Sequence, residues 1–243
     1  SYANGGQLSA SNAEVWNSTA TVLKGLRWMW RKNAPLLLNP KFSWHKYSWL
    51  AQFMAQIPNY RENTIATTRL AIQARQHLFD MAEAEGIDFD LERRGILHIY
   101  HDAASFDAAR RSNALLQAGG LERFAVSGSE ARNIEPTLQT DCYGGFYTPS
   151  DATGDIHKFT SGLARACERL GVTFVQDADI EQISREGRPY AMDVLREGGT
   201  VREQHETDAI VICAGAVSRK FARQMGDSLN IYPVKGYSIS VHL

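Results

Sequence analysis

Apolar residues recur at helical spacing through much of the first half of the chain. The longest such run covers 61–85, and Gly86 follows it where helices commonly end in a left-handed residue. Pro35 and Pro58 stop two shorter runs, because proline cannot continue a helix. The pattern therefore predicts helices over 21–32, 44–57, 61–85 and 103–118.

Shorter apolar stretches bounded by turn residues predict strands. Residues 94–100 and 144–147 each form one such stretch. Further along, three short alternating segments separated by glycines indicate an antiparallel ribbon. The ribbon segments lie near 178–184, 190–196 and 201–206, and a final strand is expected over 231–241.

The second half of the chain also carries the pattern of an α/β layer. Asp155 is placed to cap a helix, and the apolar run 172–175 follows that helix as a buried strand. The unbroken apolar run within 208–215 is typical of a strand covered on both faces, with a helix from about Val217. We therefore predict an α/β fold of mixed, partly α+β character, with helices flanking the sheets.

Composition narrows the class of protein. The 243 residues carry a formal net charge of -1, whereas nucleic-acid-binding domains usually have a clear basic excess, so we expect no nucleic-acid partner. Three cysteines without a C-x-x-C pair favour reduced thiols over disulfides or a zinc site. No apolar run approaches the ~20 residues that a membrane-spanning helix needs, and no secretory leader heads the chain.

The tryptophans lie close to basic residues near the start of the chain. Trp28, Trp30, Trp44 and Trp49, interleaved with lysines and arginines, could form a surface at the headgroups of an anionic membrane. The alternative, which we favour, is that the rings pack against the core while the charges stay in solvent.

The two ends of the sequence indicate a piece of a longer protein. The chain starts without methionine in a loop-like segment and stops within a strand pattern. We therefore expect a fragment with both ends missing.

Residues 210–218 are the strongest candidate for cofactor chemistry. A strand that ends in Ala214-Gly215-Ala216 and turns into a helix exposes backbone N–H groups, and its small residues let a flat ligand approach the main chain. Dinucleotide sites are built in this way. A glycine turn of this kind is also common in α/β proteins without such a ligand.

A second candidate is the segment SYANGGQLS at residues 1–9. Its two consecutive glycines offer backbone donors to a flavin ring or a phosphate. The alternative is an ordinary surface turn. No two of the 19 glycines stand two positions apart, so the chain contains no G-x-G-x-x-G loop for a pyrophosphate.

The histidines and the candidate nucleophiles do not indicate a metal site or a hydrolase. His98 and His101 are three positions apart in or beside a strand, where such side chains point to opposite faces. We therefore predict no metal site. No serine, histidine and aspartate stand in a recognisable nucleophile motif.

Five segments, taken together and in order, resemble the FAD-dependent D-amino-acid dehydrogenases (small subunit), within the group that includes D-amino-acid oxidase, glycine oxidase and sarcosine oxidase. The first two are SYANGGQLS and LKGLRWMWRKNAPL. The others are GGFYTPSDATGDIHKFT at 144–160, DAIVICAGAVS at 208–218 and YPVKGYSISV at 232–241.

The resemblance implies two interleaved domains. A partial FAD-binding domain with flanking helices and a β-ribbon would comprise 1–10 and 150–230, without the N-terminal dinucleotide loop. A substrate domain built on a mixed sheet would comprise 11–149 and 231–243, without its C-terminal part. The family's carboxylate-binding arginine lies in that absent part, so the resemblance assigns no catalytic residue here.

The resemblance also implies cofactor-binding positions. The main chain of Ile180 would meet the adenine, and Val217 stands where many relatives carry tryptophan. The positions along the flavin and dinucleotide would be Ala3, Asn4, Gly5, Gly6, Gln7, Leu8, Ala214, Gly215 and Ala216. Candidate substrate-pocket residues are Tyr147, Tyr232 and Tyr237, for which the alternative is an ordinary packing role.

The implied reaction is hydride transfer from the α-carbon of a D-amino acid to FAD, and hydrolysis then gives a 2-oxo acid and ammonia. A respiratory electron acceptor would be the partner, in the cytoplasm, with peripheral contact at the inner membrane of a bacterium. Oxidation of another small amine, such as glycine, sarcosine or hydroxyproline, stays open. A further alternative is a non-catalytic fragment, and for the 243-residue chain alone we expect a partial FAD-binding face and no turnover.

Overall fold

A computed structural model describes residues 4–29, 41–184, 189–234 and 236. Within these, the chain forms two compact units. Unit 1 holds residues 4–29 and 55–170, and unit 2 holds residues 41–54, 171–184, 189–234 and 236.

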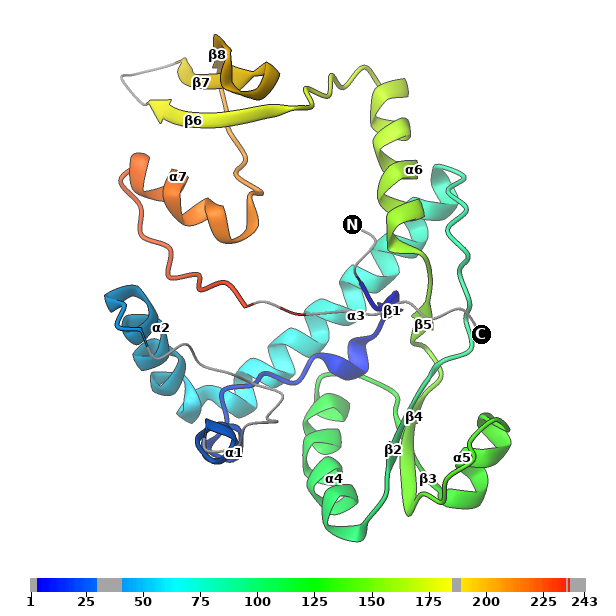
Figure 1. Ribbon diagram of the computed structural model, residues 1–243. Helices are drawn as coiled ribbons and strands as arrows, with labels where there is room; N and C mark the ends of the chain where they lie inside the picture. Colours follow the sequence, from blue (N-terminus) through cyan, green and yellow to red (C-terminus); the bar gives the residue numbers. More distant parts are fainter. Residues whose placement is uncertain (1–3, 30–40, 185–188, 235, 237–243) are drawn as a thin grey trace. The chain divides into compact units, whose positions relative to one another are not determined.

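Unit 1 contains most of the helices (Figure 1). The helix predicted over 61–85 is confirmed as α3, and Gly86 follows its end with φ +64°. Asp155 caps α6 as predicted, because its side chain accepts a hydrogen bond from the backbone N of Lys158 at 3.0 Å. The helices are α1 (Thr19–Met29), α3 (Tyr60–Ala84), α4 (Ala103–Ala118), α5 (Gly128–Ile134) and α6 (Ile156–Arg169), with 3₁₀ turns η1 (Ala10–Asn12) and η2 (Ile57–Asn59).

A three-stranded antiparallel sheet of order β2-β4-β3 lies beside α4 in unit 1 (Figure 1). Its strands are β2 (Ile96–Tyr100), β3 (Phe124–Ser127) and β4 (Gly144–Thr148), of which β2 and β4 confirm the predicted strands. Phe106 of α4 stacks on Phe146 of β4, with centroids 5.0 Å apart and planes 13° apart. This aromatic pair fixes α4 against one face of the sheet.

A second antiparallel pair joins the start of the chain to residues after β4. It consists of β1 (Gln7–Leu8) and β5 (Ala152–Thr153), with Leu8 opposite Ala152. Both residues are buried together with Phe79, Phe89 and Phe159. This core cluster is formed by side chains of α3, of the loop that follows α3, and of α6. It therefore anchors the segment that contains β1.

Helices α3 and α4 approach closely at Gly119, which follows the end of α4. A Cβ atom on Gly119 would lie 2.6 Å from the Cβ of Thr68, which is fully buried on α3. Only glycine fits this contact without a shift of one helix.

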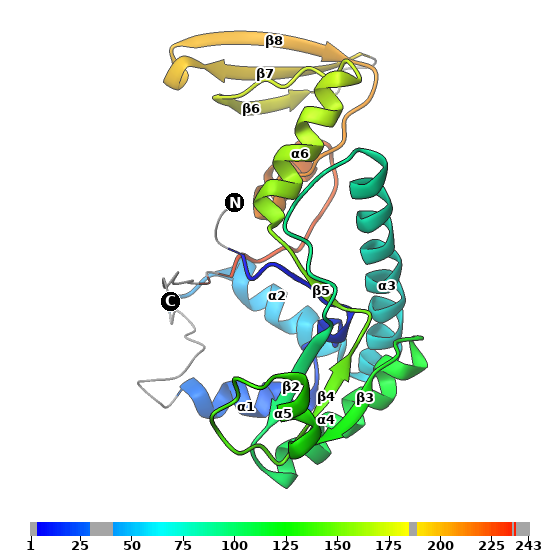
Figure 2. The same ribbon diagram turned by 90° about the vertical axis from the view of Figure 1, so that its right-hand side faces the viewer.

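Unit 2 contains the antiparallel ribbon, whose three strands lie side by side in Figure 2. The strands β6 (Ala178–Ser184), β7 (Tyr190–Arg196) and β8 (Val201–Thr207) confirm the predicted ribbon. The side chain of Gln224 in α7 (Ser218–Gln224) accepts a hydrogen bond from the backbone N of Ile183 at 3.0 Å. The unit also includes most of α2 (Trp44–Ala55), the 3₁₀ turn η3 (Glu197–Gly199) and the 3₁₀ turn η4 (Gly215–Val217).

Several predicted elements are wrong. Residues 172–175 and 208–214 form no strand, and Val211 is 86% exposed. An apolar run predicts burial, but a strand also needs neighbours for its backbone groups, and neither run pairs with a strand of the described residues. Residues 231–234 and 236 are likewise outside any strand, and the rest of the predicted strand 231–241 lies outside the described residues.

The tryptophans only partly follow the favoured interpretation. Trp44 is 77% exposed, so packing against the core is wrong for this ring. Trp28 is half-buried, with Lys24 Nζ 4.9 Å above its centroid, and Trp49 is also half-buried. Trp30 lies outside the described residues. Cys142, Cys167 and Cys213 are free cysteines.

Candidate functional site

Asn4, Gly5 and Gly6 form a tight turn directly before β1. The backbone N of Gly6 donates to Oδ1 of Asn4 at 2.8 Å, and the Gly6 carbonyl accepts from the backbone N of Gly154 at 2.8 Å. Gly6 has φ +60°, and a Cβ there would lie 2.6 Å from the Gly154 carbonyl oxygen. The turn therefore requires glycine at position 6.

Solvent exposure differs along this segment. Asn4, Gly5 and Gln7 are exposed, and no atom lies within 4 Å of a Cβ placed on Gly5. Leu8 is buried in the core. The main chain at Asn4 and Gly5 is thus open to a flat ligand, whereas the Leu8 side chain holds the segment in place.

A buried carboxylate fixes the backbone directly after β1. Asp151 accepts hydrogen bonds from the backbone N of Ala10 at 2.9 Å, the backbone N of Ser11 at 3.2 Å and Oγ of Ser9 at 3.1 Å. Arg75 of α3 forms an ion pair with the same carboxylate, and the Asp151 and Arg75 side chains are 0% and 10% exposed. This network sets the direction in which the chain leaves β1.

Sequence reasoning missed Asp151 and Arg75. Asp151 lies inside the motif GGFYTPSDATGDIHKFT. Its position directly before the short strand β5 is the feature that could have indicated a structural role. Arg75 gave no signal, because it is one of several charged residues on a long helix.

Ile180 lies on β6 in unit 2. It is 39% exposed, next to an irregularity in the pairing of β6 with β7. Its carbonyl accepts a hydrogen bond from Nζ of Lys220 on α7 at 3.3 Å. The residue whose main chain is predicted to meet the adenine is therefore partly exposed, and its carbonyl already has a cationic neighbour.

Residues 214–216 form an exposed turn into α7 in the same unit. The backbone N of Ala214 donates to Oγ of Ser218 at 3.1 Å, and Gly215 has φ +55° with no atom within 4 Å of a placed Cβ. Ala214, Gly215 and Ala216 are all exposed. The predicted turn is present, although the predicted strand before it is not.

The tyrosine candidates have packing contacts. The hydroxyl of Tyr147 donates to the Arg94 carbonyl at 2.8 Å. The ring of Tyr232 lies 5.3 Å from that of His45 and 5.9 Å from that of Trp49, between centroids. Tyr237 and Ala3 lie outside the described residues.

The predicted cofactor residues fall into two groups. Asn4, Gly5, Gly6, Gln7 and Leu8 lie in unit 1, where the structure brings them together. Ile180 and the 214–216 turn lie in unit 2. Within these two groups, Gly5 and Gly215 are the positions where no atom lies within 4 Å of a placed Cβ.

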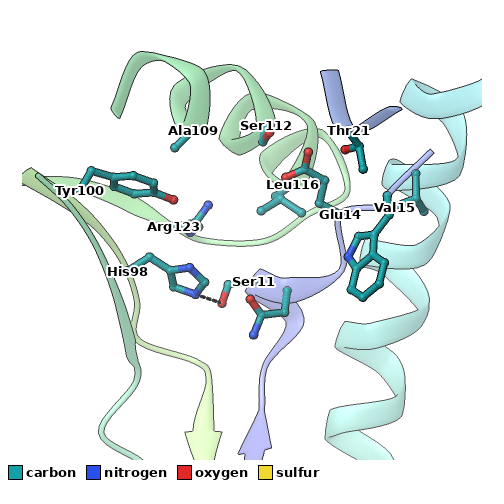
Figure 3. A pocket seen from close by; sticks show the side chains of 12 residues that line it. Ser11, Glu14, Val15, Thr21, His98, Tyr100, Ala109, Ser112, Leu116 and Arg123 are labelled. Carbon is teal, nitrogen blue, oxygen red and sulfur yellow. Dashed lines mark hydrogen bonds between the residues drawn. The ribbon is translucent and has the colours of Figure 1, made fainter. Parts of the chain in front are cut away.

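Unit 1 contains a pocket of about 300 Å³, and part of its lining comes from the residues that follow β1 in the chain (Figure 3). Nε2 of His98 on β2 is 3.1 Å from Oγ of Ser11 on η1. Burial, and then the positive charge of Arg123, hold the pKa of His98 below its usual 6.5, against the opposing charge of Asp151. His98 is therefore a neutral hydrogen-bonding group at neutral pH.

The lowered pKa of His98 predicts how stability depends on pH. The unfolded chain binds a proton to His98 more readily than the folded chain does, so the stabilising effect is complete above about pH 6.5 and is lost as the pH falls through the lower folded pKa. NMR titration of the His98 ring should give a midpoint below 6.5. A midpoint at or above that value contradicts the prediction.

Comparison with known proteins identifies the family. The sequence pattern of the family described as "DAO: FAD dependent oxidoreductase" matches residues 1–243, the whole chain. The chain belongs to this family. The resemblance found from its motifs is thus confirmed, and FAD is the cofactor of this FAD dependent oxidoreductase family.

Relatives of this chain carry the name D-amino acid dehydrogenase. The protein of Mesorhizobium japonicum named "D-amino acid dehydrogenase 3" is 56% identical over 243 residues, which are 100% of this chain and 58% of that protein. The "D-amino acid dehydrogenase" of Paramagnetospirillum magneticum is 37% identical over 251 residues, which cover 99% of this chain and 57% of that protein. The chain therefore spans less than two thirds of the length of these relatives.

A solved structure shares the fold. Glycine oxidase from Geobacillus kaustophilus matches with a TM-score of 0.58 and 18% identity, over 93% of this chain and 48% of that one. This likeness shows a mixed helix-and-sheet fold of the FAD-dependent oxidoreductase type.

The residues present fit a flavin. Gly5 leaves open space beside an exposed main chain, and Gly215 does the same in unit 2. Flat rings need this kind of approach, because a side chain at either position would keep the ring away from the backbone.

Proposed function

We propose that the native protein containing this chain is an FAD-dependent D-amino-acid dehydrogenase. It oxidises a D-amino acid at the α-carbon, and water then releases a 2-oxo acid and ammonia. The observation that carries the proposal is the 56% identity to "D-amino acid dehydrogenase 3" over every residue of the chain.

The chemistry divides between cofactor and protein. Bound FAD would supply the hydride acceptor. In unit 1, the main chain at Asn4 and Gly5 would lie along the flavin, and the Asp151 network would hold that backbone in place. In unit 2, the Ile180 main chain and the turn around Gly215 are the positions that the family resemblance assigns to the dinucleotide.

The domain assignment is part of the proposal. Residues 1–10 and 150–230 would form the FAD part, and 11–149 and 231–243 would form the substrate part. Tyr147 and Tyr232 would reach the substrate only if their present packing contacts loosen, so we rank them below the backbone positions.

The electron acceptor and location are proposed from the same relationship. A dehydrogenase, unlike an oxidase, passes its electrons to an acceptor other than oxygen. We propose that this acceptor is a respiratory carrier at the cytoplasmic face of a bacterial inner membrane. No helix within the described ranges is long and apolar enough to cross a membrane. The exposed Trp44 and the Lys24–Trp28 pair supply amphipathic groups for a peripheral contact.

Turnover with an artificial dye as electron acceptor tests the proposal. The native protein should form a 2-oxo acid and ammonia in equal amounts from D-alanine, and far less from L-alanine, glycine or sarcosine. Faster turnover of glycine or sarcosine would instead assign the protein to oxidation of another small amine. Absence of product from all D-amino acids tried would overturn the proposal.

A further inference from the structure

Arg123 is a buried cation without a matching anion. It precedes β3, is 3% exposed, and its guanidinium lies 5.0 Å from the ring centroid of Phe146. Its Nε has no hydrogen-bond partner, and no carboxylate of the described residues forms an ion pair with it. A buried charge in this state is costly unless something pairs with it.

The nearby acidic groups are already engaged. Asp151 forms an ion pair with Arg75, and Oε1 of Glu14 accepts a hydrogen bond from the hydroxyl of Tyr60 at 2.5 Å. Burial lowers the pKa of Arg123, and the Tyr100 hydroxyl and then the charges of Asp151 and Glu14 oppose this effect. Arg123 thus keeps binding capacity for a further anion.

Glu14 takes part in a partly buried hydrogen bond. Burial and then the hydrogen bond to Glu14 raise the pKa of Tyr60 to about 12, so the Tyr60 hydroxyl stays protonated and donates to Glu14. The Glu14 carboxylate, unlike the Asp151 carboxylate, has no cationic partner within ion-pair distance in the described residues.

Both charges line the same space. Figure 3 shows Arg123, Glu14 and His98 around one pocket, with Ser11 and Ser112 as further polar groups. Its volume of about 300 Å³ suits a small organic molecule. One wall carries a guanidinium and another a carboxylate, and neither forms an ion pair within the described residues.

We propose that this pocket binds a small zwitterionic amino acid, with the ligand carboxylate on Arg123 and the ligand ammonium toward Glu14. A guanidinium binds a carboxylate through two parallel N–H donors. Neutral His98 and the hydroxyls of Ser11 and Ser112 complete the polar surroundings. The proposal concerns binding alone and does not rest on the proposed oxidation.

Three probes separate the parts of the pocket. Alanine carries both charges, acetate carries only the carboxylate, and methylammonium carries only the cation. In the native protein, alanine should bind most tightly and should shift the NMR signal of Arg123 Nε–Hε. Acetate should shift the same signal at higher concentration, and methylammonium should not.

Substitutions then assign the two charges. Arg123→Met should weaken alanine binding roughly tenfold to a hundredfold, the size of a lost charged hydrogen bond. Glu14→Gln should keep acetate binding and remove the preference for alanine over acetate. Arg110→Met, which removes an exposed arginine of α4, is the matched control and should change neither.

A folding defect can be told apart from a binding defect. Because an apolar side chain often replaces a buried ion without loss of stability, Arg123→Met should melt at or above the wild-type temperature without ligand. Arg123→Lys keeps the charge but not the paired donors, and should bind alanine more weakly than wild type. The proposal is overturned if alanine leaves the Arg123 signal unchanged, or if both Arg123 variants bind alanine as wild type does.

Discussion

Replacement of Asp151 by asparagine is expected to destabilise the chain by about 3–5 kcal/mol, the usual cost of removing one partner of a buried ion pair. The carboxylate is fully buried and accepts from two backbone N–H groups, one hydroxyl and Arg75. Asparagine would place an NH₂ group beside these donors and leave the arginine charge uncompensated. Urea unfolding measures the loss.

Two further variants make the Asp151 result specific. Asp141→Asn removes a carboxylate that is 94% exposed in its ion pair with Arg132, and should change stability by less than ~1 kcal/mol. Arg75→Gln combined with Asp151→Asn should recover part of the loss, because no buried charge then remains unpaired. An unfolding midpoint for Asp151→Asn equal to wild type would contradict the assigned role.

The adjacent glycines Gly5 and Gly6 should differ in how far alanine substitution lowers stability. Gly6→Ala should cost about 1–2 kcal/mol from its left-handed φ alone, and more because the new Cβ would meet the Gly154 carbonyl oxygen at 2.6 Å. Gly5→Ala should change stability by less than ~0.5 kcal/mol, because its surroundings are open.

The same pair of variants tests the proposed flavin contact. Since a methyl group at position 5 would occupy the space through which the ring approaches, Gly5→Ala should weaken FAD binding roughly tenfold, equivalent to about 1.4 kcal/mol. FAD affinity can be measured by quenching of flavin fluorescence. Unchanged affinity in a stable Gly5→Ala protein would remove this segment from the flavin site.

Periodic patterns predicted the elements that depend on local sequence. Helix α3 follows from helical spacing with glycine at its end, and the ribbon β6-β7-β8 follows from alternation between glycines. Helix α5 was missed because seven residues are too few to show a period. Its capping box, with Ser127 and Glu130 bonded reciprocally, was nevertheless visible as S-x-x-E.

Contacts between distant residues explain what the sequence could not predict. Arg75 and Asp151 are 76 positions apart, and nothing local marks them as partners. The pairing of β1 with β5 involves only two residues in each strand, too few for alternation. Runs 172–175 and 208–214 were misread because apolar character predicts burial but does not supply a paired neighbour.

The backbone positions of the candidate site came from motif order and small residues. Gly5, Gly6 and Gly215 stand out in the sequence because glycine permits unusual turns and close approach. Arg123 did not stand out, because its significance comes from burial beside Glu14 and His98 in the folded unit.

Anaerobic addition of D-alanine to the FAD-loaded native protein tests the proposed function most directly, because it follows the flavin without any electron acceptor. We predict complete loss of the oxidised-flavin absorbance with D-alanine and no loss with L-alanine at the same concentration. An oxidised spectrum that persists with every D-amino acid, or equal bleaching by L-alanine, would contradict the assignment as a D-amino-acid dehydrogenase.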